Sequence, residues 1–249
     1  MTEQRAIPAF PGNVGLTHLK VYDSLAPDGL LGGSPHMHFA CTEAYIVLNG
    51  KGAVQTLSAQ GYAELPLEKG RVLWFTPGLI HRLINLDGQL EIMVVMQNSG
   101  LPEAGDFVLT FPEQILNDSE AYFKAASLAA SGHVYTSSDQ AAKHRRDLAV
   151  EGFIELRKQF ECEGKVALER FYRSALALVQ AKLPAWRAVW QNGPLQGVEQ
   201  TAAQLSALSE GQTEHLFEGA IYALNPPDEP RKLGVCGTLS VYQPEGVLT

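Results

Sequence analysis

Short hydrophobic runs separated by glycine, proline and asparagine fill roughly the first 110 residues of the chain. Runs of this length between turn-forming residues are typical of β-strands. The spacing of these runs along the chain indicates a sandwich or a barrel. We expect strands at residues 17–22, 44–48, 53–57, 72–76, 81–85 and 90–97.

Beyond about residue 110 the apolar positions follow the period of an α-helix instead. One helix is expected from Phe111 to about Leu128, and a second from Ser137 towards Phe160. Gln140 lies three residues after Ser137, which is the spacing of a capping box at a helix start.

The clearest helical pattern covers residues 168–179, where apolar side chains recur every three or four positions and form one stripe. Pro184 is expected to end this helix, because proline breaks a helix interior. A turn is expected at residues 192–194, followed by a shorter helix at 198–208. Strands are expected again at residues 220–224 and 235–242.

Of the 249 residues, 45% are hydrophobic and 18% are charged, which is typical of a folded globular protein. The formal net charge of -8 weighs against a nucleic-acid partner, since phosphate binding requires a basic surface. The same charge weighs against binding to an anionic membrane. No segment of the sequence is apolar for long enough to cross a bilayer.

The N-terminal sequence shows no secretory signal, so we expect a cytoplasmic protein. The three cysteines, Cys41, Cys162 and Cys236, are widely separated and odd in number. This usage suits reduced thiols better than a disulfide framework.

His36, His38 and Glu43 form the most informative pattern in the sequence. In an extended strand alternate side chains share a face, so the two histidines present their imidazoles to one side. Glu43 can return a carboxylate after a short turn, and His81 can bring a third imidazole from a separate strand. Three nitrogens and one oxygen suit a divalent transition metal. Chance would produce only about 0.01 such His-x-His pairs with a correctly spaced glutamate.

These residues resemble the two sequence motifs of the cupin superfamily. The first motif is a glycine, His-x-His, a glutamate and a glycine, and the second is a glycine, Pro-x-Gly, a histidine and an asparagine. Gly29 and Pro77 each depart from the pattern by one residue, and both lie in turns, where such a shift is tolerated. The positions that match, over roughly residues 15 to 100, are His36, His38, Glu43, Gly50, Gly70, Gly78, His81 and Asn85.

The resemblance implies a mainly β protein built on a cupin-type antiparallel β-barrel (a double-stranded β-helix), with a helix-rich C-terminal extension. It also implies a metal held inside the barrel by His36, His38, Glu43 and His81. We expect residues 1–110 to form the metal-binding barrel. Residues 111–219 should form a helical region packed on the barrel or at a subunit interface, and residues 220–249 should return as strands to the sheet.

The ligand set leaves the metal open among manganese, iron, nickel and zinc. Tyr45 and Leu83 lie two residues after Glu43 and His81, so strand alternation turns them towards the same interior. They are candidate pocket walls, although Tyr45 would fill the barrel core equally well. Asn85 is either a hydrogen-bond partner that orients a ligand or a residue that closes the strand end.

Three functions are compatible with this pattern. The favoured one is a mononuclear metalloenzyme that acts on a small oxygen-rich organic molecule, with oxidoreductase chemistry of the dioxygenase type. The first alternative is a metal-dependent isomerase or lyase acting through an enediolate. The second is a non-catalytic cupin that binds a metabolite. In the second alternative the helical half serves assembly, and the amphipathic stripe at residues 168–179 is compatible with a subunit contact in a homodimer.

Overall fold

The computed structural model describes residues 8–128, 137–227 and 230–244. Its strands form two antiparallel sheets, one of six strands in the order β10-β11-β1-β8-β3-β6 and one of five in the order β5-β4-β7-β2-β9. The strands are β1 (Gly15–Val21), β2 (His36–Met37), β3 (Glu43–Asn49), β4 (Lys51–Ser58), β5 (Gly61–Glu68), β6 (Val72–Phe75), β7 (Ile80–Asn85), β8 (Glu91–Met96), β9 (Val108–Leu109), β10 (Lys232–Leu233) and β11 (Gly237–Tyr242).

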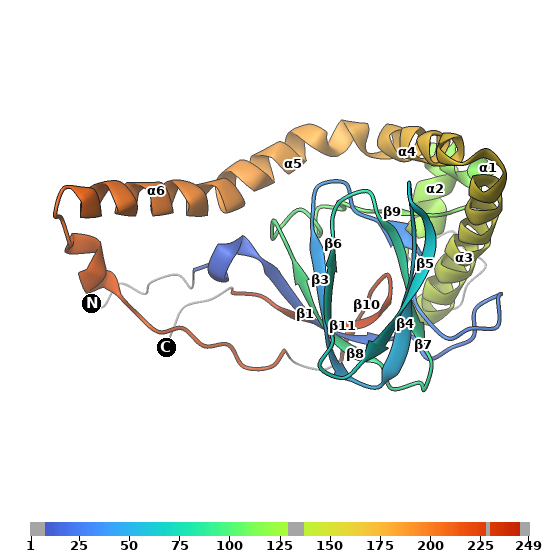
Figure 1. Cartoon of the computed structure of the whole chain (residues 1–249), viewed down its shortest axis with the longest axis horizontal. Helices are drawn as coiled ribbons and strands as arrows, with labels where there is room; N and C mark the ends of the chain where they lie inside the picture. Colours follow the sequence, from blue (N-terminus) through green and yellow to red (C-terminus); the bar gives the residue numbers. More distant parts are fainter. Residues whose placement is uncertain (1–7, 129–136, 228–229, 245–249) are drawn as a thin grey trace.

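The two sheets share one hydrophobic core, and helix α3 (Ser138–Glu163) runs beside the five-stranded sheet (Figure 1). Positions in β8 alternate between buried and half-buried, because only the inner face of its sheet is covered. Every residue of β7 is buried, because α3 covers the outer face of that sheet. This mainly β jelly roll with a helix-rich C-terminal region confirms the predicted fold class.

Each of the six strands predicted in the first part of the chain is present, as β1, β3, β4, β6, β7 and β8. Strand β5 was not predicted, because most of its residues are exposed and it contains Pro66. Such a strand is tolerated only at a sheet edge, which is where β5 lies.

The predicted strand at residues 220–224 is wrong. Ile221 is 90% exposed there and no neighbouring strand pairs with the segment. The strand predicted at 235–242 is confirmed as β11, which pairs with β1.

The single helix predicted from Phe111 to Leu128 is wrong, because the segment forms two helices, α1 (Glu113–Leu116) and α2 (Ser119–Ala126). Asp118 separates them: its backbone is extended, and its side chain caps α2 by accepting a hydrogen bond from the amide of Ala121. Helix α3 begins as predicted, with the Ser137 side chain accepting a hydrogen bond from the amide of Gln140.

Helix α4 (Lys165–Val179) carries the predicted apolar stripe. Pro184 does not end this helix. A 3-10 turn, η2 (Gln180–Lys182), follows Val179, and Pro184 lies in the first turn of α5 (Leu183–Trp190), where its missing N–H is not needed.

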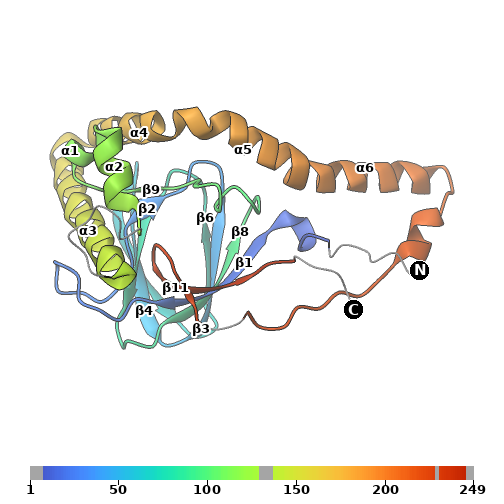
Figure 2. The ribbon, with the colours of Figure 1, turned by 180° about the vertical axis from the view of Figure 1, so that it is seen from behind.

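The turn predicted at residues 192–194 is also wrong. These residues belong to a π-helical segment, η3 (Gln191–Leu195), which accommodates Pro194 and continues into α6 (Gln196–Ser209). Together α5, η3 and α6 extend away from the barrel (Figure 2). No residue of α6 is buried, and the chain then returns through η4 (Glu214–Glu218) towards the sheet. In the described parts of the chain, no helix combines the length and apolarity needed to span a membrane.

Gly152 allows α3 to approach the barrel closely. A Cβ atom at this position would lie 2.1 Å from the carbonyl oxygen of Thr110. We therefore expect Gly152→Ala to lower the free energy of unfolding by about 1–3 kcal/mol through overpacking, although alanine favours helix. Gly197→Ala on exposed α6, where the nearest atom is 3.4 Å away, should stabilise by roughly 0.5–1 kcal/mol. Urea denaturation of both variants measures the two changes in the free energy of unfolding. Changes of the same sign in both variants would contradict the close approach of α3.

Candidate metal centre

Four side chains, two from β2 and its end and one each from β3 and β7, converge between the two sheets. His36 of β2 is paired directly with His81 of β7, and their rings lie 4.3 Å apart between centroids. His38 follows at the end of β2, while Glu43 comes from the opposite sheet as the first residue of β3. All four residues are buried, and one nitrogen or oxygen atom from each lies within 4.8 Å of all the others. The structure thus brings together the four residues that the sequence predicted.

Backbone carbonyls orient all three imidazole rings. The Nδ1 atoms of His36, His38 and His81 contact the carbonyl oxygens of Ser34, Asp106 and Leu79, respectively. A carbonyl oxygen only accepts hydrogen bonds, so each Nδ1 must be the donor. In its neutral form each ring then has its lone pair on Nε2, and the Nε2 atoms of His38 and His81 lie beside Glu43. Metal-binding histidines in proteins are commonly held in this way.

The centre of the group contains buried acceptors that face one another. Glu43 Oε2 lies 3.1 Å from His81 Nε2 and 3.3 Å from His38 Nε2. Glu43 Oε2 and His81 Nε2 are fully buried, and neither has a partner in hydrogen-bonding geometry among the described residues. Unpaired buried acceptors are costly, and a cation among them would satisfy both. The donor set therefore fits a divalent transition metal, and the role of these residues as ligands stays a prediction.

The charges of the group depend on burial and on one another. Burial and the neighbouring His81 and His38 rings lower the pKa of His36 well below its usual value. Burial would also lower the pKa of His38, but the Glu43 carboxylate raises it overall. Although burial raises the pKa of Glu43, the adjacent His38 and His81 rings hold it well below the usual range. Glu43 is thus a carboxylate, which is the form that binds a metal.

The three predicted pocket residues have different surroundings. Tyr45 is completely buried, its ring packs at 5.2 Å on Phe75, and its hydroxyl has no hydrogen-bond partner in the part of the chain that the structure describes. Burial, and then the negative charge of Glu43, raise the pKa of Tyr45 well above its usual value. Leu83 belongs to the hydrophobic core. The Asn85 amide donates to the carbonyl of Val21 and accepts from the amide of Leu90. These contacts match its interpretation as a residue that closes the strand end.

Sequence reasoning missed Asp106. Its backbone carbonyl holds His38, and its carboxylate accepts hydrogen bonds from the amides of Phe39 and Ala40. A backbone contact leaves no residue-type signature, and Asp106 is far from His38 in sequence.

The cysteines are free thiols, as predicted. Cys41 is buried and its pKa is raised by burial and by the nearby Asp106, so it is an inert thiol.

Two antiparallel sheets that enclose three histidines and a glutamate define a jelly-roll protein with a metal-site-like group. The cupin family model matches residues 9–118, a stretch that contains all four side chains. Residues 9–118 thus match the family whose motifs the sequence resembles, and they form the β domain of the chain. No curated protein matches the sequence significantly.

Several solved structures resemble part of the chain. The TDP-fucose-3,4-ketoisomerase WlaRA from Campylobacter jejuni is 14% identical, with a TM-score of 0.31 over 37% of this chain and 64% of that one. The capsular polysaccharide assembling protein CapF from Staphylococcus aureus is 19% identical, with a TM-score of 0.32 over 41% of this chain and 28% of that one. Oxalate decarboxylase from Bacillus subtilis is 19% identical, with a TM-score of 0.25 over 26% and 17%. The chain covers less than two thirds of each protein, and similarities of this size carry no argument about activity.

Proposed function

We propose that His36, His38, Glu43 and His81 bind one divalent transition metal, and that the protein is a mononuclear metalloenzyme acting on a small oxygen-rich organic molecule. The observation that supports this best is the set of buried acceptors that face one another within 4.8 Å. Manganese, iron, nickel and zinc all suit three imidazoles and one carboxylate. A divalent ion held there would keep a net positive charge and would stabilise negative charge on a substrate oxygen.

The residues of the chain supply the remaining parts of the site. Glu43 contributes the one negative charge, and the carbonyls of Ser34, Asp106 and Leu79 keep the rings in a fixed orientation. The aromatic ring of Phe75 packs at 4.1 Å on His81 and helps to exclude water from that side. A preorganised, dry surrounding strengthens electrostatic interactions at a reacting centre.

We favour oxidation by dioxygen over isomerisation through an enediolate. Phosphorylated substrates of isomerases need lysine or arginine side chains to bind their phosphate. Among the described residues, the cavity beside His38 is lined by no lysine or arginine. Homodimer formation, the cytoplasmic location and domain boundaries at residues 110 and 219 stay predictions.

Metal analysis combined with dioxygen uptake tests the proposed function. Protein purified without chelators should contain about one equivalent of a transition metal, and mass spectrometry should identify any co-purified small molecule. We expect dioxygen uptake with that molecule or with enolisable keto compounds, loss of uptake in Glu43→Gln, and normal uptake in Glu199→Gln on exposed α6. Carbonyl isomerisation without dioxygen would instead support the isomerase alternative. Tight metabolite binding without turnover would support the non-catalytic one.

A further inference from the structure

A cavity of about 620 Å3 lies where the barrel meets helix α4. Its walls come from the end of β2, the β4–β5 turn, the loop between β6 and β7, and α4. This volume is within the range of small-molecule sites in proteins. The C-terminal helical region therefore forms part of a cavity whose other walls belong to the barrel.

Helix α4 is tied to the barrel through Gly78. The hydroxyl of Tyr172 donates a hydrogen bond to the carbonyl of Gly78 at 2.9 Å. The amide of Gly78 in turn donates to the carbonyl of His38 at 2.9 Å. Gly78 has a φ of +88°, a conformation that favours glycine. These two hydrogen bonds fix Tyr172 beside the strand that carries two of the candidate ligands.

The cavity reaches the candidate metal centre at His38. Of the four residues of the centre, only His38 lines the cavity. His38 is also the most exposed of them at 8%, compared with 0% for His81. A molecule in the cavity would therefore approach the centre from the His38 side.

The lining of the cavity is apolar or uncharged, apart from His38. Phe39, Leu79 and Leu176 provide apolar surface, and Ser58, Gln60 and Thr76 provide neutral polar groups. No aspartate, glutamate, lysine or arginine of the described chain lines it. A charged group placed against this lining would lose hydration without gaining an ionic partner. The lining therefore favours a ligand whose body is uncharged and largely apolar.

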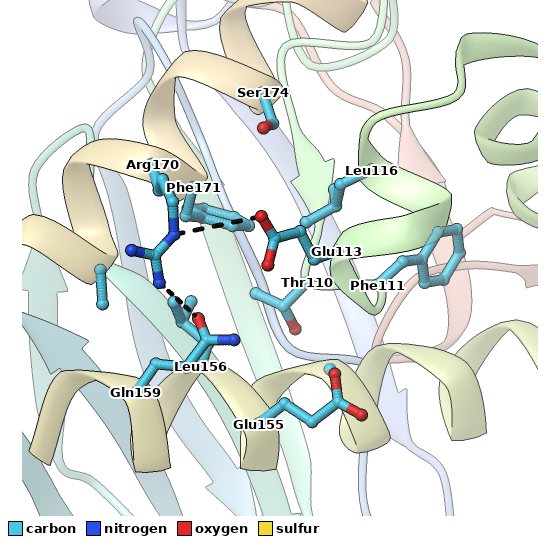
Figure 3. A pocket seen from close by; sticks show the side chains of 12 residues that line it. Thr110, Phe111, Glu113, Leu116, Glu155, Leu156, Gln159, Arg170, Phe171 and Ser174 are labelled. Carbon is cyan, nitrogen blue, oxygen red and sulfur yellow. Dashed lines mark hydrogen bonds and ion pairs between the residues drawn. The ribbon is translucent and has the colours of Figure 1, made fainter. Parts of the chain in front are cut away.

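Two other cavities do not compete for this role. The pocket between α1, α3 and α4 has a volume of about 30 Å3, enough for little more than a water molecule. Its polar side chains already interact, since Arg170 contacts both Glu113 and Gln159 (Figure 3). A larger groove of about 750 Å3 beneath α5 contacts none of the four residues of the centre.

We propose that this cavity binds an oxygen-chelating molecule with an uncharged, apolar body, aromatic or branched aliphatic, and that Tyr172 and Leu176 of α4 determine this specificity. The inference rests on the proposed metal centre, towards which the chelating oxygens would face. Leu176 supplies apolar contact, while Tyr172 holds α4 against the Gly78 loop. Sugar phosphates and dicarboxylates are disfavoured, because the charge on their bodies would meet no cationic side chain in the described lining.

Two α-keto acids with the same chelating end test this specificity. Phenylpyruvate has an aromatic body, whereas the body of oxaloacetate carries a second carboxylate. Isothermal titration of the protein as purified should show that phenylpyruvate binds at least about tenfold more tightly, as expected for apolar contact in a pocket. Leu176→Lys should weaken the binding of phenylpyruvate and strengthen the binding of oxaloacetate. The ratio of the two affinities should therefore fall about tenfold or more. Leu205→Lys on exposed α6 is the matched control and should leave the ratio unchanged.

The outcomes separate this inference from the metal proposal. Three results, each in a protein with normal metal content, would overturn the inference. They are equal affinities for the two probes, binding of neither probe, and an affinity ratio that does not change in Leu176→Lys. Elemental analysis of the same samples provides the second readout. If the protein contains no metal and still prefers phenylpyruvate in a way that depends on Leu176, the apolar specificity is supported and the metal centre is refuted.

Discussion

Replacing His81 or His36 by alanine should abolish metal loading. Each substitution removes one of three imidazole donors and leaves Glu43 facing an empty volume. Even losing a residue that only orients a ligand costs about 10–100-fold in metal affinity, so loss of a ligand should cost more. Elemental analysis of the purified variants should therefore find metal at background level, compared with about one equivalent in the parent protein.

His215→Ala is the matched control, because His215 lies on η4 and outside the converging group. It should keep the full metal content. Circular dichroism identifies variants that keep the fold, which matters because His81 is completely buried. Unchanged stoichiometry in both His36→Ala and His81→Ala would count decisively against the assigned ligands.

Asp28→Ala should be the most destabilising substitution outside the centre. Arg82 follows His81 on β7 and is only 1% exposed between the sheet and α3. Its guanidinium donates to both carboxylate oxygens of Asp28 and to the carbonyl of Gly33. Removing the carboxylate leaves a buried charge without a counterion. Because Asp28 is partly open to solvent, we expect a loss of about 2–4 kcal/mol in the free energy of unfolding.

Two variants check the cause of this effect. Adding Arg82→Met to Asp28→Ala removes the orphaned charge and should recover most of the lost stability. Glu161→Ala breaks the exposed pair between Arg157 and Glu161, and should cost about 1 kcal/mol or less. Urea denaturation measures all three, and equal losses in Asp28→Ala and Glu161→Ala would refute the buried pair.

The Asp28 contribution should also depend on pH. Burial raises the pKa of Asp28, but the hydrogen bond and charge of Arg82 lower it overall. A depressed pKa in the folded state means that the contribution is present above the unfolded pKa of about 3.9 and is lost as the pH falls through the folded value. The stability difference between the parent protein and Asp28→Ala should therefore shrink below about pH 4.

The positions of the candidate ligands could be predicted because they follow from local geometry. Strand alternation places His36 and His38 on one face, and the apolar run that starts at His81 indicates a second strand. The direct pairing of His36 with His81 could not be predicted, because it depends on the register between β2 and β7. The carbonyl of Asp106 was beyond prediction, because backbone groups carry no sequence signature.

The helical region was harder to predict than the barrel. The apolar stripe of α4 was correct, but nothing in the sequence indicates that Tyr172 lies against the loop at Gly78. Pro184 and Pro194 were interpreted as breaks, whereas a helix start and a π-helical segment accommodate them. Tertiary contacts, which local patterns do not encode, decide both the path of the helices and their position on the barrel.

Locating the metal tests the central claim most directly. Crystals of untreated protein should give an anomalous difference peak at the absorption edge of the metal that elemental analysis identifies. The account predicts one peak between the two sheets, about 2.0–2.2 Å from the Nε2 atoms of His36, His38 and His81 and from the Glu43 carboxylate. A peak elsewhere, or histidine rings turned away from a common point, would contradict it.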